Sequence, residues 1–253
     1  MNDLLKSPFL VLSFLFVVLW LSARIGASFR KRRPLDEAAR QDLDLIVPAT
    51  LTLLGLIIGF SFSMAVSRYD QRKNYEEAEA NAIGTEYVRA DLLPSADAAK
   101  LRELLKQYLD QRILFYETRG ERELRKINND TTQLQKQLWS LVQAPGAQPT
   151  PLLALAVSGM NDVLNSQGYT QAAWWNRIPI AAWFLMAAIA ICSNLLVGYS
   201  SRRAKIGPVE SLVLPLVLSI AFFLIADIDS PRRGVIRVVP QNLMSLAQSL
   251  PSN

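Results

Sequence analysis

A stripe of small side chains within residues 45–67 is the first place where this chain could do chemistry. Its members recur every three or four residues and therefore share one face of a helix; they are Thr52, Gly55, Gly59, Ser63 and Ser67. Small faces let membrane helices pack closely. The same hydroxyls and exposed backbone could instead line a pore and replace part of an ion's hydration shell, with Phe60 and Phe62 as a hydrophobic constriction. The sequence leaves both interpretations open.

A second candidate site follows the last apolar stretch, in the sequence ADIDSPRRG (residues 226–234). Its charged members are Asp227, Asp229, Arg232 and Arg233. Carboxylates at a membrane boundary need partners, so one interpretation is an ion-pair clamp with Arg68 or Arg72 at the matching end of the second apolar stretch. The other is a cation site on the two carboxylates. We assign no metal to it, because two carboxylates one residue apart are weak evidence for calcium.

Residues 76–89 (EEAEANAIGTEYVR) form a third segment of interest, because charge is dense there and small residues recur. Helical spacing places Ala78, Ala82 and Glu86 on one face. Small residues on a helix favour packing against another helix. We therefore predict a packed helical stalk whose charged side chains are solvated.

What the chain lacks argues against an enzyme. It has no histidine and one cysteine, which removes Ser-His triads, Cys-His dyads, histidine-ligated haem, nearly all catalytic zinc sites and any intramolecular disulfide. No phosphate-binding or nucleophile-elbow motif is present. We therefore assign no catalytic residues and no cofactor. The net charge of +5 comes from basic clusters beside apolar stretches, which suit anionic lipid headgroups rather than nucleic acid.

Four apolar stretches dominate the chain, at residues 9–23, 45–67, 178–201 and 211–226. The second and third are longer than the roughly 20 residues that a helix needs to cross a bilayer. The first resembles a signal peptide, but its strong positive charge follows the apolar stretch, so we interpret it as an uncleaved anchor. Trp174, Trp175 and Trp183 are expected to mark a membrane interface at the start of the third stretch.

The charged segment between the second and third stretches is expected to be a helical lobe in water. The second span should continue as a helix to about residue 93, followed by helices at 96–126, 133–142 and 152–165. The predicted fold is an all-α membrane protein with four transmembrane helices and this helical domain inserted between the second and third. The predicted segments are 1–67 (first helix pair), 68–143 (stalk and lobe), 144–151 (linker), 152–177 (lobe helix leading to the membrane), 178–229 (second helix pair) and 230–253 (short tail).

The loop charges favour one orientation by a small margin. Basic residues are densest in the two short loops, after the first and third apolar stretches, and such loops lie on the cytoplasmic side. That count places both termini and the lobe outside the cytoplasm. The basic residues near the opposite membrane ends are almost as numerous, so the side on which the lobe lies stays open.

Two segments resemble the bestrophin-like family of bacterial integral membrane proteins. They are LLGLIIGFSFSMAVSRYDQRKNYEEAEANAIGTEYVRADLLP (residues 53–94) and FFLIADIDSPRRG (residues 222–234). The family is named after bestrophins, pentameric anion channels with four spans per subunit, a cytosolic lobe and a calcium-sensing acidic cluster after the last span. The resemblance implies an oligomeric channel of the bacterial inner membrane, with the second span lining the pore. Only Asp227 and Asp229 occupy the place of the acidic cluster, so calcium gating does not carry over.

Two functions therefore compete at the level of sequence. The first is a homo-oligomeric bestrophin-like channel that passes an inorganic anion through the lipid bilayer. The alternative is a non-conducting membrane scaffold or envelope sensor that binds a partner through its helical lobe.

Overall fold

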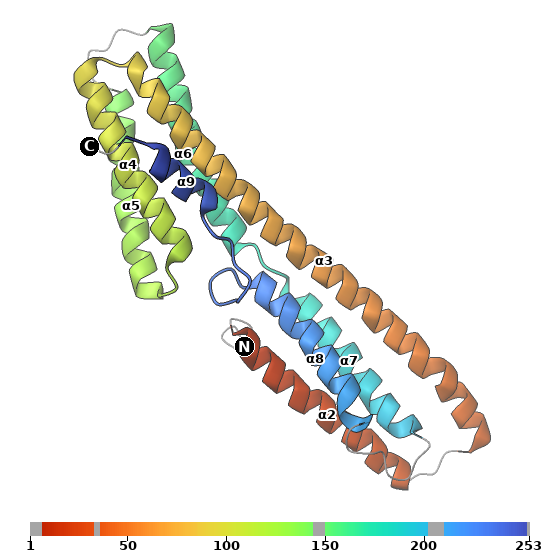
Figure 1. The fold of residues 1–253 in the computed structure, drawn as a ribbon. Helices are drawn as coiled ribbons and strands as arrows, with labels where there is room; N and C mark the ends of the chain where they lie inside the picture. Colours follow the sequence, from red (N-terminus) through yellow and green to blue (C-terminus); the bar gives the residue numbers. More distant parts are fainter. Residues whose placement is uncertain (1–6, 33–35, 144–149, 202–209, 252–253) are drawn as a thin grey trace. The chain divides into compact units, whose positions relative to one another are not determined.

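The chain is helical throughout the part that its computed structural model describes, residues 7–32, 36–143, 150–201 and 210–251 (Figure 1). The elements in chain order are α2 (Pro8–Arg32), α3 (Glu37–Arg89), the short 3-10 helix η1 (Ala90–Leu92), α4 (Ser95–Glu117), α5 (Glu121–Val142), α6 (Pro151–Trp175), α7 (Ile180–Ser200), α8 (Glu210–Asp229) and α9 (Gln241–Ser249). Within these described ranges no strand occurs. The predicted all-α class is confirmed.

Four helical stretches are long and apolar enough to cross a membrane, judged by length and composition. They are Pro8–Arg32, Glu37–Leu92, Pro151–Ser200 and Ser211–Asp229. Each contains one of the four apolar stretches seen in the sequence. The helices extend past the apolar residues into polar flanks, because backbone hydrogen bonding does not stop where lipid-compatible side chains end. Two helices tolerate an internal proline, Pro48 in α3 and Pro215 in α8.

The chain divides into two compact units. The apolar unit comprises Met1–Arg68 and Arg177–Ile236, and the helical lobe comprises Tyr69–Asn176 and Arg237–Asn253. The predicted segment boundaries stay a prediction, and residues 144–149 of the predicted linker lie outside the described residues.

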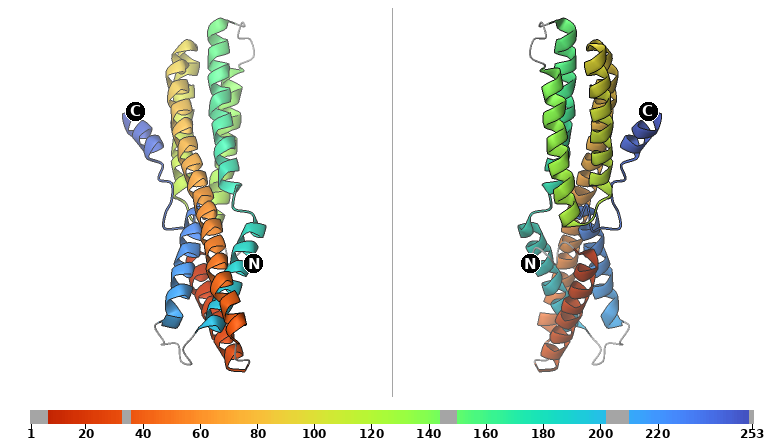
Figure 2. Two further views of the ribbon diagram at one scale, coloured as in Figure 1. Left: turned by 90° about the vertical axis from the view of Figure 1, so that its right-hand side faces the viewer. Right: turned by 90° about the vertical axis from the view of Figure 1, so that its left-hand side faces the viewer.

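In the apolar unit, α2 lies alongside both α7 and α8 (Figure 2). Two glycines set how closely α2 and α7 approach. A Cβ placed on Gly26 would lie 2.0 Å from the Leu195 carbonyl oxygen, and one on Gly198 would lie 2.0 Å from the Ala23 carbonyl oxygen. Any larger residue at either position would push the backbones apart. The close helix contact in the apolar unit therefore uses Gly26 and Gly198 rather than Gly55 and Gly59 of α3.

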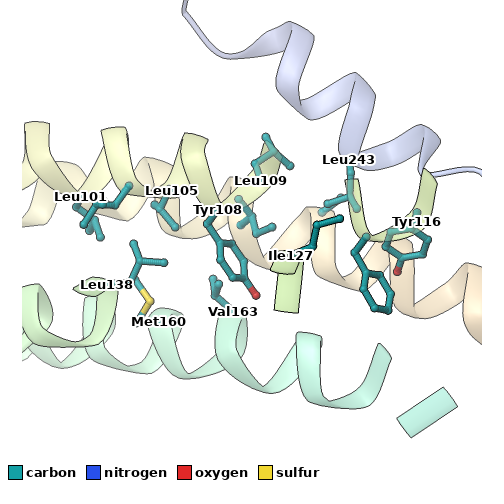
Figure 3. Close-up of a cluster of buried hydrophobic side chains, with 14 of the residues drawn as sticks. Leu101, Leu105, Tyr108, Leu109, Tyr116, Ile127, Leu138, Met160, Val163 and Leu243 are labelled. Carbon is teal, nitrogen blue, oxygen red and sulfur yellow. The ribbon is translucent and has the colours of Figure 1, made fainter. Parts of the chain in front are cut away.

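The lobe has its own hydrophobic core, built from the carboxyl-terminal part of α3 and from α4, α5, α6 and α9. Figure 3 shows Leu138, Met160 and Val163 facing Leu105 and Tyr108 across this core. Leu101, Leu105, Tyr108 and Leu109 of α4 are fully buried or nearly so, which agrees with the apolar stripe at three- and four-residue steps. Leu243 of α9 completes the core from the end of the chain.

Three expectations about the lobe were wrong. The predicted helix at 96–126 is interrupted at residues 118–120, and α5 then runs unbroken to Val142. The predicted helix at 152–165 continues to Trp175. Trp174 is not at an interface: it is buried in the lobe core, with ring centroids 5.0 Å from Phe115 and 5.5 Å from Tyr116. Trp175 is exposed and Trp183 packs against Phe222 in the apolar unit.

Candidate functional site

The small-residue face of α3, formed by Thr52, Gly55, Gly59, Ser63 and Ser67, lies uncovered on the surface of the chain. All five residues are exposed. A Cβ added to Gly55 or to Gly59 would meet no atom of the described residues within 4 Å, apart from the neighbouring turns of α3 itself. Close packing against another helix of the same chain is therefore not what these glycines serve.

The opposite side of the same helical segment makes the contacts within the chain. Leu54, Ser61 and Ala65 are buried, and they lie away from the small-residue face because a helix turns roughly 100° per residue. The Thr52 hydroxyl donates a hydrogen bond to the Pro48 carbonyl oxygen, at 2.8 Å. One side of α3 thus anchors the helix in the apolar unit and leaves the small-residue face free.

The two phenylalanines point in different directions. They are two residues apart, which separates them by roughly 200° around the helix. Phe62 borders the small-residue face at Gly55 and Phe60 borders it at Ser67, each roughly 20° from that neighbour around the helix, and both are exposed. The two side chains therefore flank the small-residue face, one at each edge.

The segment after α8 folds into a tight turn around Asp227. The carboxylate of Asp227 accepts hydrogen bonds from the backbone N–H groups of Val235, at 2.7 Å, and Ile236, at 2.8 Å. Gly234 is required in this turn, because a Cβ there would lie 2.3 Å from the Asp227 carbonyl oxygen. The carboxylate thus fixes the chain reversal that follows the helix.

Asp229 ties the start of the segment before α7 to the end of α8. It accepts the Ile178 backbone N–H at 3.1 and 3.2 Å, and the Arg68 guanidinium lies 3.7 Å from one carboxylate oxygen. The structure therefore brings together Arg68 and Asp229, whereas Arg232 is half-buried and Arg233 is exposed. These contacts favour the ion-pair clamp over the cation site. Among the described ranges, no group of three or more Asp, Glu or Cys side chains is arranged to hold a metal ion.

Arg72 has a different role from the one considered in the sequence. It is buried, and its Nε donates to the Ala173 carbonyl oxygen while its Nη2 donates to the Asn176 carbonyl oxygen, both at 3.2 Å. These carbonyls belong to the end of α6, where helix carbonyls lack partners within the helix. Arg72 thus caps α6 from α3 inside the lobe.

Sequence reasoning missed the inward face of α3 in the lobe. Glu76, Glu79 and Glu86 are buried rather than solvated, which corrects the expected solvated stalk. With Arg72, Ile83 and Ala90 they follow steps of four, three, four, three and four residues, the spacing of an inward-facing helical stripe. This spacing could have predicted that these positions are buried. Four of the six residues are charged, however, and charged residues are usually expected in solvent.

Glu79 is the centre of a buried polar network between α3, α4 and α6. Its carboxylate pairs with the Arg112 guanidinium and accepts hydrogen bonds from the Tyr116 hydroxyl, at 3.3 Å, and the Thr170 hydroxyl, at 3.2 Å. Burial alone would lower the pKa of Arg112, but the Glu79 carboxylate outweighs it and raises the pKa. Burial and then the Glu79 charge raise the pKa of Tyr116. The phenol is therefore fixed as a neutral donor.

Glu76 holds the end of the chain. Its carboxylate accepts the Leu243 backbone N–H at 2.9 Å and the Asn242 side-chain amide at 2.6 Å. Both donors lie in the first turn of α9, so Glu76 caps this helix from α3. Residues 238–250 therefore pack onto the lobe through a contact that nothing in the tail sequence revealed.

The family is decided by comparison with known sequences. A model of the bestrophin-like domain matches residues 10–243. The chain belongs to the bestrophin-like family. No curated protein sequence matches this bestrophin-like chain at a significant level.

Solved structures support the same fold for this bestrophin-like protein. A bacterial bestrophin homologue from Klebsiella pneumoniae is 14% identical and aligns over 94% of this chain and 99% of its own, with a TM-score of 0.62. The I180A variant of that homologue is 12% identical over 93% of this chain and 95% of its own, with a TM-score of 0.63. At this level of identity the similarity shows the fold alone.

Proposed function

We propose that this bestrophin-like protein is a homo-oligomeric ion channel of the bacterial inner membrane and that it passes inorganic anions. In this proposal α2, the apolar part of α3, α7 and α8 cross the bilayer, and the lobe between the second and third crossings lies in water. Family membership and the four apolar helices support the proposal.

The observation that carries the proposal is the uncovered small-residue face of α3. In the part of the chain that the structure describes, nothing outside α3 lies within 4 Å of a Cβ position on Gly55 or Gly59, although the other side of α3 is buried. Lipid tails gain nothing from hydroxyls and bare backbone. In a water-filled path, or against a second copy of the chain, the hydroxyls could form hydrogen bonds and the glycine backbone could be closely approached. A ring of copies about one axis supplies such a path, because each copy turns the same face inward.

The chemistry of the small-residue face suits an anion. Residues 45–67 contain no carboxylate, so the face has no fixed negative charge to repel one. The hydroxyl groups of Ser63 and Ser67 can donate hydrogen bonds to an anion in place of water. Phe60 and Phe62, at the two edges of this face, are the side chains placed to narrow the path.

The test is anion flux in liposomes that contain the purified protein. Because Phe62 narrows the path in this proposal, Phe62→Ala should raise anion flux severalfold. Met64→Ala is the control, since Met64 is exposed but lies roughly 120° around the helix from the middle of the small-residue face; it should leave flux near that of the unmodified protein. The oligomeric state in a membrane mimetic should be a closed ring.

Two results would contradict the channel. One is the absence of flux above protein-free liposomes for chloride, nitrate and bicarbonate. The other is a monomer in several mild detergents and in lipid nanodiscs, because four helices leave little room for a pore. Either result would favour a non-conducting scaffold.

A further inference from the structure

Glu86 is a buried carboxyl group without a partner. Its side chain is fully shielded from solvent. In the part of the chain that the structure describes, neither of its oxygens has a hydrogen-bond donor in reach. Glu76 and Glu79 on the same helix face both accept hydrogen bonds. Glu86 is therefore the exception among the buried carboxylates of the lobe.

The carboxyl of Glu86 fills the space next to Gly159 of α6. A Cβ on Gly159 would lie 2.0 Å from Oε2 of Glu86 and 2.4 Å from Nη1 of Arg89. The missing side chain at Gly159 is thus what admits the carboxyl between α3 and α6. A side chain at this position would have to displace the Glu86 carboxyl and the Arg89 guanidinium.

Two charged side chains act on this carboxyl, one from each helix. Arg89 lies one turn further along α3, and its Nη1 donates to the Leu155 carbonyl oxygen of α6, at 3.4 Å. Asp162 lies one turn beyond Gly159 on α6. Burial raises the pKa of Glu86 to about 8, Arg89 opposes that rise and Asp162 adds to it. An unpaired buried carboxylate is costly, so the carboxyl carries a proton at neutral pH.

We propose that Glu86 is a proton-binding site that controls the contact between α3 and α6: the helices close around the neutral carboxyl and loosen when its proton leaves. The step is a simple dissociation, in which the acid releases one proton to water and keeps the electron pair. The resulting carboxylate needs donors, and the nearest are Arg89 and water. Reaching either of them opens the space at Gly159. This inference stands independently of ion conduction.

Infrared difference spectroscopy of the full chain in lipid nanodiscs tests the proton directly. The unmodified protein should show a carboxylic acid C=O band that disappears with a midpoint near pH 8. Glu86→Gln should remove that band. Glu77→Gln, nine residues earlier on the exposed side of α3, should leave the band in place.

The two neighbouring charges give predictions of opposite sign. Asp162→Asn removes a repelling charge and should move the midpoint to lower pH. Arg89→Gln removes an attracting charge and should move it to higher pH. A band that titrates near pH 4.5, survives Glu86→Gln, or ignores both neighbouring variants would overturn the assignment.

Hydrogen exchange tests the helix contact. After correction for the intrinsic pH dependence of exchange, amides 155–163 of α6 should lose protection above the midpoint in the unmodified protein. In Glu86→Gln, which stays neutral, protection should not change across the same range. Equal behaviour of the two proteins would show that the proton does not control the contact.

Thermal unfolding supplies the sign of the pH effect. The folded pKa of Glu86 lies above the value of 4.5 for a free carboxyl, so folding retains a proton that the unfolded chain releases. Relative to Glu86→Gln, the unmodified protein should be equally stable below about pH 4.5. Its unfolding constant should then rise about tenfold per pH unit and level off above about pH 8. A flat difference across this range would contradict the retained proton.

Discussion

At the scale of single residues, the buried pair of Glu79 and Arg112 makes the sharpest stability prediction. Glu79→Gln leaves the Arg112 guanidinium, which is fully buried, without its counter-charge. Breaking one partner of a buried ion pair costs about 3–5 kcal/mol. The free energy of unfolding of the purified protein should fall by that amount in a denaturant titration monitored by circular dichroism.

The controls for this prediction come from the same helices. Glu77→Gln changes an exposed residue and should shift the unfolding free energy by less than about 0.5 kcal/mol. Replacing both members of the pair, as in Glu79→Leu with Arg112→Met, should recover most of the loss, since no unpaired charge remains. A double variant as unstable as Glu79→Gln would show that the pair is not the cause.

The same residues show why the sequence misled at this scale. Charge density along residues 76–89 predicts solvent exposure, and for Glu77 that prediction is confirmed. Glu76, Glu79 and Glu86 are buried because each meets a neighbour that is distant in sequence: α9, Arg112 and Gly159 respectively. Residue type cannot supply such partners. Helical spacing could have separated the inward charges from the outward ones.

At the scale of helices, the crossing of α2 and α7 depends on two small residues. Gly26→Ala would place a methyl group against the Leu195 carbonyl oxygen, and Gly198→Ala would place one against the Ala23 carbonyl oxygen. Backbone cannot yield as a flexible side chain can, so each change should cost about 1–3 kcal/mol of unfolding free energy. Thermal melting in detergent measures this.

Gly168→Ala is the matched control for the helix crossing. Gly168 lies inside α6, and a Cβ there would meet nothing within 4 Å. Alanine favours a helix over glycine by about 0.5–1 kcal/mol, so this change should leave the melting temperature equal or raise it. If Gly26→Ala melted like Gly168→Ala, the close approach of α2 and α7 would not be a determinant of stability.

The helices that could be predicted from sequence are those whose apolar composition is enough to define them. The four apolar stretches are helical except for residues 178, 179 and 201 at the ends of the third, because a long run of uncharged apolar residues has few other stable states in lipid. The break between α4 and α5 was not predicted, since Thr118 and Gly120 adopt ordinary extended backbone angles, with φ of −70° and −74°. Helix α9 has nine residues, too few to form alone, and depends on docking to Glu76.

At the scale of the whole molecule, the sequence located the candidate site but could not say what covers it. The small-residue face of α3 follows from spacing alone. Whether another helix of the chain covers Gly55 and Gly59 depends on tertiary structure, and the absence of any atom within 4 Å decides it. The clamp at Asp229 was likewise one of two interpretations until Arg68 and the Ile178 amide were seen beside it.

The side of the membrane on which the lobe lies is the last prediction. Loop charges place it outside the cytoplasm, but they discriminate weakly, since basic residues are nearly as numerous on both sides. Membership of the bestrophin-like family favours the cytoplasm, because the lobe of bestrophins is cytosolic. We therefore expect Glu103→Cys, on the exposed side of α4, to resist a membrane-impermeant maleimide in intact cells and to react after lysis.

The control for the lobe lies at the start of α3, before the apolar part of that helix. Glu37→Cys is also exposed and should react in intact cells. Both variants are made in Cys192→Ala, which removes the chain's one cysteine. Labelling of Glu103→Cys without lysis, with Glu37→Cys protected, would reverse the orientation. The Glu86 proton would then respond to the pH outside the cytoplasm, whereas a cytoplasmic lobe exposes it to the regulated pH of the cell.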